Sequence, residues 1–219
     1  MAPKIIIINP NSNEAVTDGI DLAMDTLRMS GGPEIRCLTL QEGPPGVQTQ
    51  QDVESVILPL VNLAKSLENE ASAFIIACFS DPGLHAVREA VSRPVLGIAE
   101  CGVLTALTMG QTFGVIAILK EAIPRHLRIW GAMGVSERFA GELAVGLTVD
   151  ELSDRERTLS RMIEVGRRLR DERDASTIVM GCAGMVAFRE PLQEALHIPV
   201  IEPTQAAGAM ALGRARLSW

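Results

Sequence analysis

Residues 71–91 read ASAFIIACFSDPGLHAVREAV, and much of this pattern recurs at residues 175–195 as ASTIVMGCAGMVAFREPLQEA. The offset of 104 residues places Cys78 on Cys182. In each copy an apolar run typical of a buried strand leads into a cysteine and then into a segment with helical periodicity. The repeat therefore predicts two related α/β halves, each with one cysteine at the carboxyl end of a strand.

The repeat extends beyond these two segments. The further matches pair PVL at 94–96 with PVI at 199–201, AL at 106–107 with AL at 211–212 and, more weakly, IIII at 5–8 with VIAI at 115–118. Two halves with equivalent strands suggest two lobes around a pseudo-twofold axis. Open α/β sheets bind ligands at the carboxyl ends of their strands, which is where both cysteines are expected.

Short apolar runs alternate with longer amphipathic ones along the chain, which is typical of an α/β protein with parallel strands. Strands are expected at Ile5–Ile8, Ile35–Leu40, Phe74–Ala77, Val95–Ile98, Phe113–Leu119, Ile178–Met180 and Val200–Ile201. Helices are expected from residue 12 or 13 to Gly31, and at 52–69, 82–91, 101–109, 120–133, 154–172 and 203–217.

These elements predict an α/β fold of two pseudo-symmetric lobes, each a mostly parallel sheet flanked by helices, with the active site in the cleft between them. The first lobe is expected to comprise residues 1–97 and 207–219 and to carry Cys78. The second is expected to comprise residues 98–206 and to carry Cys182.

Composition excludes several function classes. The 219 residues are 47% hydrophobic, which provides for a sizeable core, and the formal net charge is −7. Such a charge disfavours nucleic-acid binding, as does the scarcity of aromatic side chains. No apolar run approaches the length of a membrane span, and the amino terminus lacks the apolar core of a secretory signal. We therefore expect a cytoplasmic protein that binds neither nucleic acid nor membrane.

The four cysteines and three histidines do not form a metal-site pattern. No C-x-x-C occurs, so four free thiols are expected and no metal site is predicted. Motifs for nucleotide binding, serine hydrolases and zincins are likewise missing from the sequence, and no cofactor is predicted. Cys37, within a strand, and Cys101, within a helix, fit ordinary core residues.

The surroundings of Cys78 and Cys182 suit acid–base chemistry. We expect Asp81 to cap a helix that starts at Pro82, so that Cys78 lies just before a helix amino terminus, which can lower a thiol pKa. Gly181 and Gly184 allow close approach of the backbone to a ligand at Cys182. Two opposed thiols can invert a carbon beside a carbonyl: one thiolate removes the proton, and the other thiol returns one to the opposite face.

At these residues the chain resembles the hydantoin racemase branch of the aspartate/glutamate racemase superfamily. The resemblance rests on IIIINPNSN at 5–13, ACFSDPGLHAVRE at 77–89, PVLGIAE at 94–100, VMGCAGM at 179–185 and IPVIEPTQAA at 198–207. It implies a cofactor-independent isomerase with a catalytic cysteine from each lobe, at Cys78 and Cys182. It further implies substrate contacts at Asn11 and Ser12 and, through backbone N–H groups, at Phe79, Ser80, Ala183 and Gly184.

The resulting prediction is a racemase of 5-monosubstituted hydantoins that acts on a small molecule and forms a homo-oligomer. Allantoin racemase is an alternative, as are aspartate or glutamate racemase, maleate cis–trans isomerase and an arylmalonate-type decarboxylase; the last keeps only the second cysteine. A binding module that kept the scaffold without the chemistry is the non-enzyme alternative. The chain departs from the family pattern at Ile118, at Glu202-Pro203-Thr204 and at Cys101.

Overall fold

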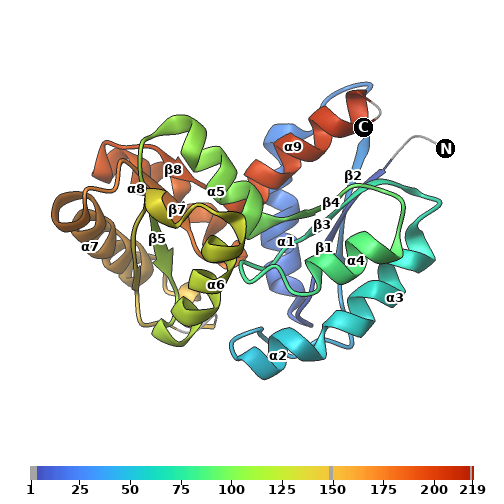
Figure 1. Cartoon of the computed structure of the whole chain (residues 1–219), viewed down its shortest axis with the longest axis horizontal. Helices are drawn as coiled ribbons and strands as arrows, with labels where there is room; N and C mark the ends of the chain where they lie inside the picture. The colour runs from blue at the N-terminus through green and yellow to red at the C-terminus, as the bar shows by residue number, and fades with distance from the viewer. Residues whose placement is uncertain (1–3, 148–149, 218) are drawn as a thin grey trace. The chain divides into compact units, whose positions relative to one another are not determined.

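The computed structural model describes residues 4–147, 150–217 and 219. The chain divides into two compact units, Met1–Cys101 with Thr204–Trp219, and Gly102–Pro203. The boundaries expected from the sequence lie a few residues away, at 97/98 and 206/207. Each unit contains a four-stranded parallel sheet flanked by helices, which confirms the predicted fold class (Figure 1).

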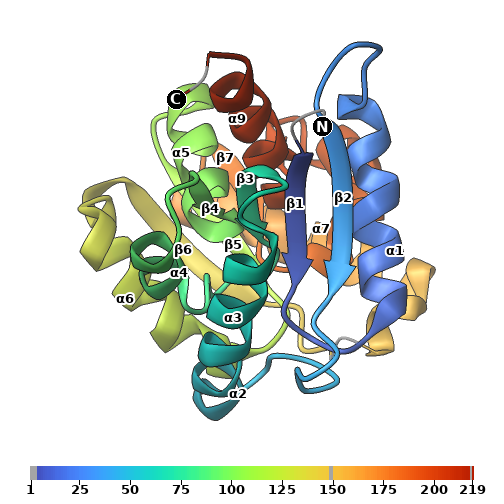
Figure 2. The same cartoon turned by 90° about the vertical axis from the view of Figure 1, so that its right-hand side faces the viewer.

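The first unit is built on a sheet in the order β2-β1-β3-β4. Its strands are β1 (Lys4–Asn9), β2 (Glu34–Thr39), β3 (Ala71–Ile76) and β4 (Val95–Gly97). Its helices are α1 (Glu14–Ala23), α2 (Gln50–Ser55), α3 (Ile57–Leu67), α4 (Leu84–Ala90) and α9 (Pro203–Leu217), with a 3₁₀ turn η1 at Met24–Leu27. Figure 2 shows α3 and α4 in front of this sheet and α1 beside β2.

The second unit repeats this topology, with its sheet in the order β6-β5-β7-β8. Its strands are β5 (Phe113–Ala117), β6 (Phe139–Ala144), β7 (Thr177–Met180) and β8 (Val200–Ile201). Its helices are α5 (Ile98–Met109), α6 (Ile123–Met133), α7 (Arg155–Arg173) and α8 (Arg189–Leu196), with 3₁₀ segments η2 (Lys120–Ala122), η3 (Ser136–Arg138), η4 (Asp150–Ser153) and η5 (Ala183–Phe188). The sequence repeat thus corresponds to a structural repeat.

The central strands are apolar because helices cover both of their faces. Ile6 and Ile8 of β1 belong to a core cluster that includes Leu60 of α3, while Ile5 and Ile7, which point to the opposite face, are equally buried. In the second unit Met180 of β7 packs in the cluster that includes residues of α7 and α8.

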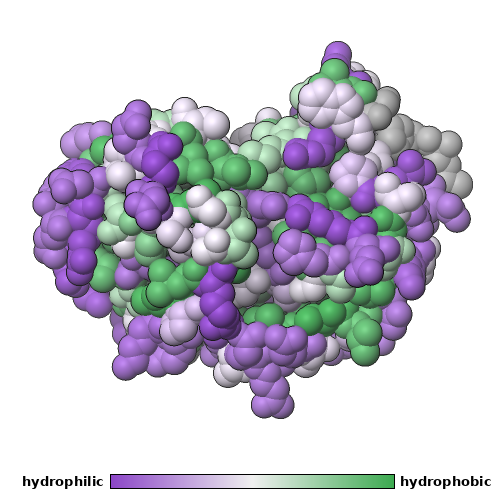
Figure 3. Space-filling model, in the orientation of Figure 1, coloured by the Kyte–Doolittle hydropathy of each residue, from purple (hydrophilic) through white to green (hydrophobic). Residues whose placement is uncertain are grey.

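The charged segment from residue 155 to 173 forms the amphipathic helix α7. Its buried positions are Thr158, Met162, Val165, Gly166 and Leu169. The outward face, at the left of Figure 3, is hydrophilic, as is usual for the solvent-exposed face of an amphipathic helix. Among the described residues, no helix is both long and apolar enough to cross a membrane.

Several predicted elements differ from the structure. Strand β6 was not predicted. The helical segment expected after Cys182 forms the 3₁₀ turn η5 and then α8, and the helix expected at 52–69 is interrupted at Val56 between α2 and α3. Strand β6 pairs only with β5, and its one buried side chain is the charged Glu142. Its sequence therefore lacks the buried apolar alternation that identifies a strand.

Candidate functional site

Cys78 follows the end of β3, at the carboxyl edge of the first sheet. The N–H of Ala77 still donates to the carbonyl of Ile8 on β1, at 2.9 Å, and the chain then leaves the sheet. The carbonyl of Cys78 accepts the N–H of Asp81 at 2.9 Å, which closes a turn around the thiol. The side chain of Cys78 is half-buried.

Asp81 does not cap the helix that follows it, which corrects the expectation from sequence. Helix α4 begins at Leu84 rather than at Pro82, and its N-cap is Gly83, with a φ of 66° in the left-handed region. The carboxylate of Asp81 instead accepts the N–H groups of Ala99, at 3.0 Å, and Glu100, at 2.9 Å, in the first turn of α5. Asp81 thus connects the Cys78 turn to a helix that follows β4.

Burial raises the pKa of Asp81 to about 7. The two N–H groups of α5 oppose this shift because they favour the carboxylate, and Arg88 does so more weakly. The neighbouring carboxylate of Glu100 adds to the increase.

The loop that holds Asn11 and Ser12 lies at the same edge of the sheet, since it follows β1. The side-chain Nδ2 of buried Asn9 donates to Asn11 Oδ1 at 3.0 Å, and the N–H of Asn13 donates to the same oxygen at 2.9 Å. The N–H of Ser12 donates to the carbonyl of Pro44 at 2.9 Å. Asn11 Oδ1 therefore organises the loop, a role that the sequence did not reveal.

The second candidate cysteine follows β7 in the second unit. The N–H of Gly181 donates to the carbonyl of Ile116 at 2.8 Å, and a Cβ at residue 181 would lie only 2.6 Å from that oxygen. Cys182 is the N-cap of η5, and its Sγ accepts the N–H of Gly184 at 3.3 Å. The carbonyl of Cys182 accepts the N–H of Met185 at 3.1 Å.

The two cysteine turns therefore share one hydrogen-bond pattern. In each, the cysteine carbonyl accepts the N–H of the residue three positions later, Asp81 in one unit and Met185 in the other. The offset of 104 residues that relates the cysteines also relates these two residues.

The pKa of the Cys182 thiol is raised to about 11. Burial is the largest cause, and the carboxylate of Glu202 adds to it, whereas the N–H of Gly184 acts in the opposite direction. The effect of burial on the pKa is thus larger than that of the Gly184 N–H, and Cys182 is a neutral thiol at pH 7.

The other predicted contact residues differ in how they can reach a ligand. The side chains of Phe79 and Ala183 are buried, so a ligand would meet their backbone. Ser80 is half-buried and forms no hydrogen bond to another residue in the described part of the chain. The N–H of Gly184 is already engaged with the sulfur of Cys182.

Glu202 is a further candidate for the site, which sequence reasoning did not select. It follows β8, is 2% exposed and acts electrostatically on Cys182. The sequence repeat could have pointed to this residue. The match of 94–96 with 199–201 aligns Glu202 with Gly97, so Glu202 is expected at the carboxyl end of a strand.

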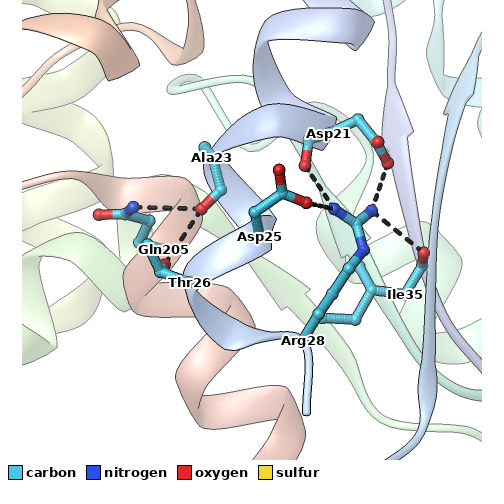
Figure 4. Close-up of polar contacts among 7 residues, drawn as sticks. All are labelled: Asp21, Ala23, Asp25, Thr26, Arg28, Ile35 and Gln205. Carbon is cyan, nitrogen blue, oxygen red and sulfur yellow. Dashed lines mark hydrogen bonds and ion pairs between the residues drawn. The ribbon is translucent and has the colours of Figure 1, made fainter. Parts of the chain in front are cut away.

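Cys37 and Cys101 have surroundings unlike a strand-end turn. Cys37 lies within β2, and burial, followed by a hydrogen bond with Asp21, raises its pKa to about 12. Asp21 also binds Arg28 at 2.6 Å, and Arg28 contacts Asp25 and the carbonyl of Ile35, so that the guanidinium ties α1 to β2 (Figure 4). Burial, with Asp81 and Glu100, raises the pKa of Cys101 to about 12.

Metal ligands do not gather in the described part of the chain: no group of three or more His, Cys, Asp or Glu residues there could hold a metal ion.

Comparison with known proteins gives consistent matches over nearly the whole chain. The hydantoin racemase of Paenarthrobacter aurescens is 32% identical over 208 residues, covering 93% of this chain and 87% of that protein. The structure of an allantoin racemase from Klebsiella pneumoniae superposes with a TM-score of 0.90 at 27% identity, covering 99% of this chain and 89% of that chain.

An allantoin racemase from Pseudomonas fluorescens shares the fold, with a TM-score of 0.94 at 24% identity, over 98% of this chain and 92% of that chain. The family model described as Asp/Glu/Hydantoin racemase matches residues 5–211. The chain therefore belongs to the Asp/Glu/hydantoin racemase family and is an isomerase of the racemase type.

Proposed function

We propose that this protein racemises 5-monosubstituted hydantoins at C5, with Cys78 and Cys182 as the two acid–base groups and without a cofactor. The observation that carries the proposal is the repeated turn, in which each unit offers one half-buried cysteine after its third strand. The hydantoin racemase relatives make the ring a reasonable substrate class.

The proposed reaction moves one proton at each face of C5. The thiolate of one cysteine takes the C5 proton, which leaves an enolate stabilised by the adjacent carbonyl. The thiol of the other cysteine then donates its proton to the opposite face of C5, so the product is the mirror image of the substrate and the two sulfurs have exchanged protonation states. Because Cys182 is a thiol in the free protein, we assign it the proton-donor role in the first turnover.

Backbone N–H groups near the cysteines would hold the developing negative oxygen. We assign this role to Phe79 and Ser80 after Cys78 and to Ala183 after Cys182, and contacts with the ring to Asn11 and Ser12. The N–H of Gly184 holds the sulfur of Cys182 and is not assigned to the oxygen. Such preorganised donors are a large source of transition-state stabilisation. A neutral ring suits this arrangement better than a free amino acid does, because the ammonium and carboxylate of an amino acid call for charged partners.

Allantoin, which is itself a 5-substituted hydantoin, is the second candidate substrate. The structural similarity to an allantoin racemase at 27% identity favours it. Single enantiomers of allantoin and of alkyl and arylalkyl hydantoins, together with aspartate and glutamate, form the test panel.

The test is proton NMR in heavy water, which follows exchange at the acidic carbon, with optical rotation recorded on the same samples. Exchange with loss of rotation for a hydantoin or allantoin is the expected result, after subtraction of exchange without enzyme. Cys78→Ser and Cys182→Ser should each reduce racemisation by about 10²–10⁴-fold. Cys37→Ser is the matched control and should leave the rate within about twofold of that of the unaltered protein. A folded protein that is silent on the whole panel would exclude the hydantoin assignment, and unsaturated dicarboxylates would be tested next.

A further inference from the structure

We propose that Asp81 is a positioning residue for Cys78: its carboxyl group holds the turn that carries the thiol against the first turn of α5. The proposal rests on the proposed function for the role of Cys78 in catalysis. The contacts that support it lie within the first unit.

The first step is the double attachment of Asp81. Its backbone N–H donates to the carbonyl of Cys78, and its carboxylate accepts the N–H groups of Ala99 and Glu100. N–H groups in the first turn of a helix have no partner within the helix, so a side-chain acceptor there stabilises the helix start. One residue therefore stabilises α5 and closes the cysteine turn.

The second step is the close packing of the Asp81 carboxyl group against Gly97, the last residue of β4. A Cβ at residue 97 would overlap the carboxyl group of Asp81. The space beside the strand is thus occupied by a side chain from the Cys78 turn, and a glycine at residue 97 makes this possible.

The third step is the backbone of Asp81, which has a φ of 42°. A non-glycine residue in the left-handed region carries a conformational cost, which persists only where other contacts impose the conformation. The two N–H groups of α5 are such contacts.

The charged groups around Asp81 reinforce the same junction. Arg88 of α4 donates to the carboxylate of Glu100 at 2.5 Å and to the carbonyl of Val95 at 2.9 Å. Two charged groups act electrostatically on the pKa of Asp81: Glu100 of α5 and Arg88 of α4. Asp81 in turn raises the pKa of Cys101 in α5. The first turn of α5 is therefore bound both by Asp81, from the Cys78 turn, and by Arg88, from α4.

In the second unit, the repeat places the carboxyl residue at the other of these two positions. The equivalent of Asp81 there is Met185, and the equivalent of Gly97 is the buried Glu202. Each unit therefore has one carboxyl residue at this pair of aligned positions, Asp81 in the first and Glu202 in the second.

The test uses Asp81→Asn and Asp81→Ala in the full chain, with Asp154→Asn as the matched control. Asp154 also accepts a helix N–H, from Arg157 at the start of α7, but lies in the other unit. The readouts are kcat and KM for racemisation, and the alkylation rates of Cys78 and Cys182 by iodoacetamide at pH 9, resolved by peptide mass spectrometry. Folding is checked by a cooperative melting transition.

For both Asp81 variants we expect kcat to fall at least tenfold with KM changed less than threefold. We also expect the released turn to make Cys78 alkylate at least fivefold faster, while Cys182 stays within twofold. Asp154→Asn should change none of these quantities. Folded Asp81 variants with unaltered kcat and an unaltered Cys78 alkylation rate would overturn the proposal. Equal increases in the alkylation rates of Cys78 and Cys182 would overturn it too, because they would show a loss of rigidity throughout the protein.

Gly97→Ala tests the same contact without removing the carboxyl group, because the added methyl displaces it. It should reproduce the Cys78 acceleration of Asp81→Ala. In the Asp81→Ala protein the space is free, so adding Gly97→Ala should change the Cys78 alkylation rate less than twofold. A larger change in the double variant contradicts the contact. Because the double variant is compared with Asp81→Ala, this test does not depend on the folding of the single Gly97 variant. If the unaltered protein racemises none of the panel, the proposed function fails, and the alkylation rates alone still decide the role of Asp81.

Discussion

At the scale of single residues, the protonation state of Cys182 has a measurable consequence. Its pKa of about 11, against an ordinary 9.0, means about 100-fold less thiolate near pH 8 than a free thiol has. We expect the rate of alkylation of Cys182 by iodoacetamide to rise about tenfold per pH unit from pH 8 to 10 and to level off near pH 11. The same protein unfolded in urea is the control, in which the rate should level off near the ordinary pKa. A plateau below pH 8 in the folded protein would contradict the burial argument.

The sign of the linked stability change follows from the same shift. The folded state holds the thiol proton up to about pH 11, whereas the unfolded state releases it near the ordinary pKa. Stability contributed by the neutral thiol is therefore lost as the pH rises through this window. Cys182→Ala should remove this part of the decrease in the free energy of unfolding.

At the scale of elements, the strand-to-turn junction after β7 depends on a glycine. A Cβ at residue 181 would lie 2.6 Å from the backbone oxygen of Ile116, and a backbone atom cannot move aside as a side-chain end can. We expect Gly181→Ala to lower the free energy of unfolding by about 1–3 kcal/mol and to reduce racemisation, because the Cys182 turn is displaced. Urea denaturation and the NMR exchange assay measure the two effects.

The matched control for this junction is Gly131→Ala in α6, where a Cβ would meet nothing within 4 Å. That change should stabilise the protein by about 0.5–1 kcal/mol, since alanine favours a helix interior. Similar losses in both variants would show that the position of the methyl group is unimportant.

A second prediction at this scale concerns the buried pair that joins α6 to β6. His126 Nδ1 and Glu142 Oε1 lie 2.6 Å apart, with side chains 3% and 0% exposed. We expect a double-mutant cycle of His126→Ala and Glu142→Ala to give a coupling energy of about 1–3 kcal/mol. The exposed pair Arg161–Glu164, also at 2.6 Å, should give less than about 1 kcal/mol. Equal couplings would show that burial does not strengthen the contact.

At the scale of the whole molecule, the two units are joined through helices. The division falls within α5, between Cys101 and Gly102, and at the start of α9, between Pro203 and Thr204. Unfolding either unit therefore disrupts a helix that continues into the other. We expect one cooperative transition in scanning calorimetry, with calorimetric and van't Hoff enthalpies that agree.

Large-to-small substitutions in each core test this cooperativity. Leu60→Ala in the first unit and Leu192→Ala in the second, both fully buried, should each cost about 2–5 kcal/mol. Each should lower the single common transition temperature. A second transition, shifted by only one of the variants, would show that the units unfold independently.

The homo-oligomer expected from the sequence remains a prediction. Light scattering during size-exclusion chromatography, which gives the molar mass in solution, tests it against the 23.5 kDa of one chain.

Much of the fold was predictable because local patterns report burial directly. The isoleucines at 5–8 are buried on both faces of β1, and a run of this kind has few alternatives to a central parallel strand. The match of Cys78 with Cys182 likewise predicted two equivalent turns, which the structure contains. Strand β6 could not be predicted in this way, because its buried residue is a glutamate that depends on His126 from another element.

The sequence by itself determined the two α/β lobes, their equivalent strands and the two cysteines at the strand ends, since apolar periodicity and the repeat are properties of neighbouring residues. Only the tertiary structure decided which N–H groups Asp81 accepts, that Glu202 acts on Cys182 and that burial raises the pKa of that thiol. Those outcomes depend on atoms brought together from distant segments, and an electrostatic interaction or a desolvation cost exists only once the chain has folded around the group.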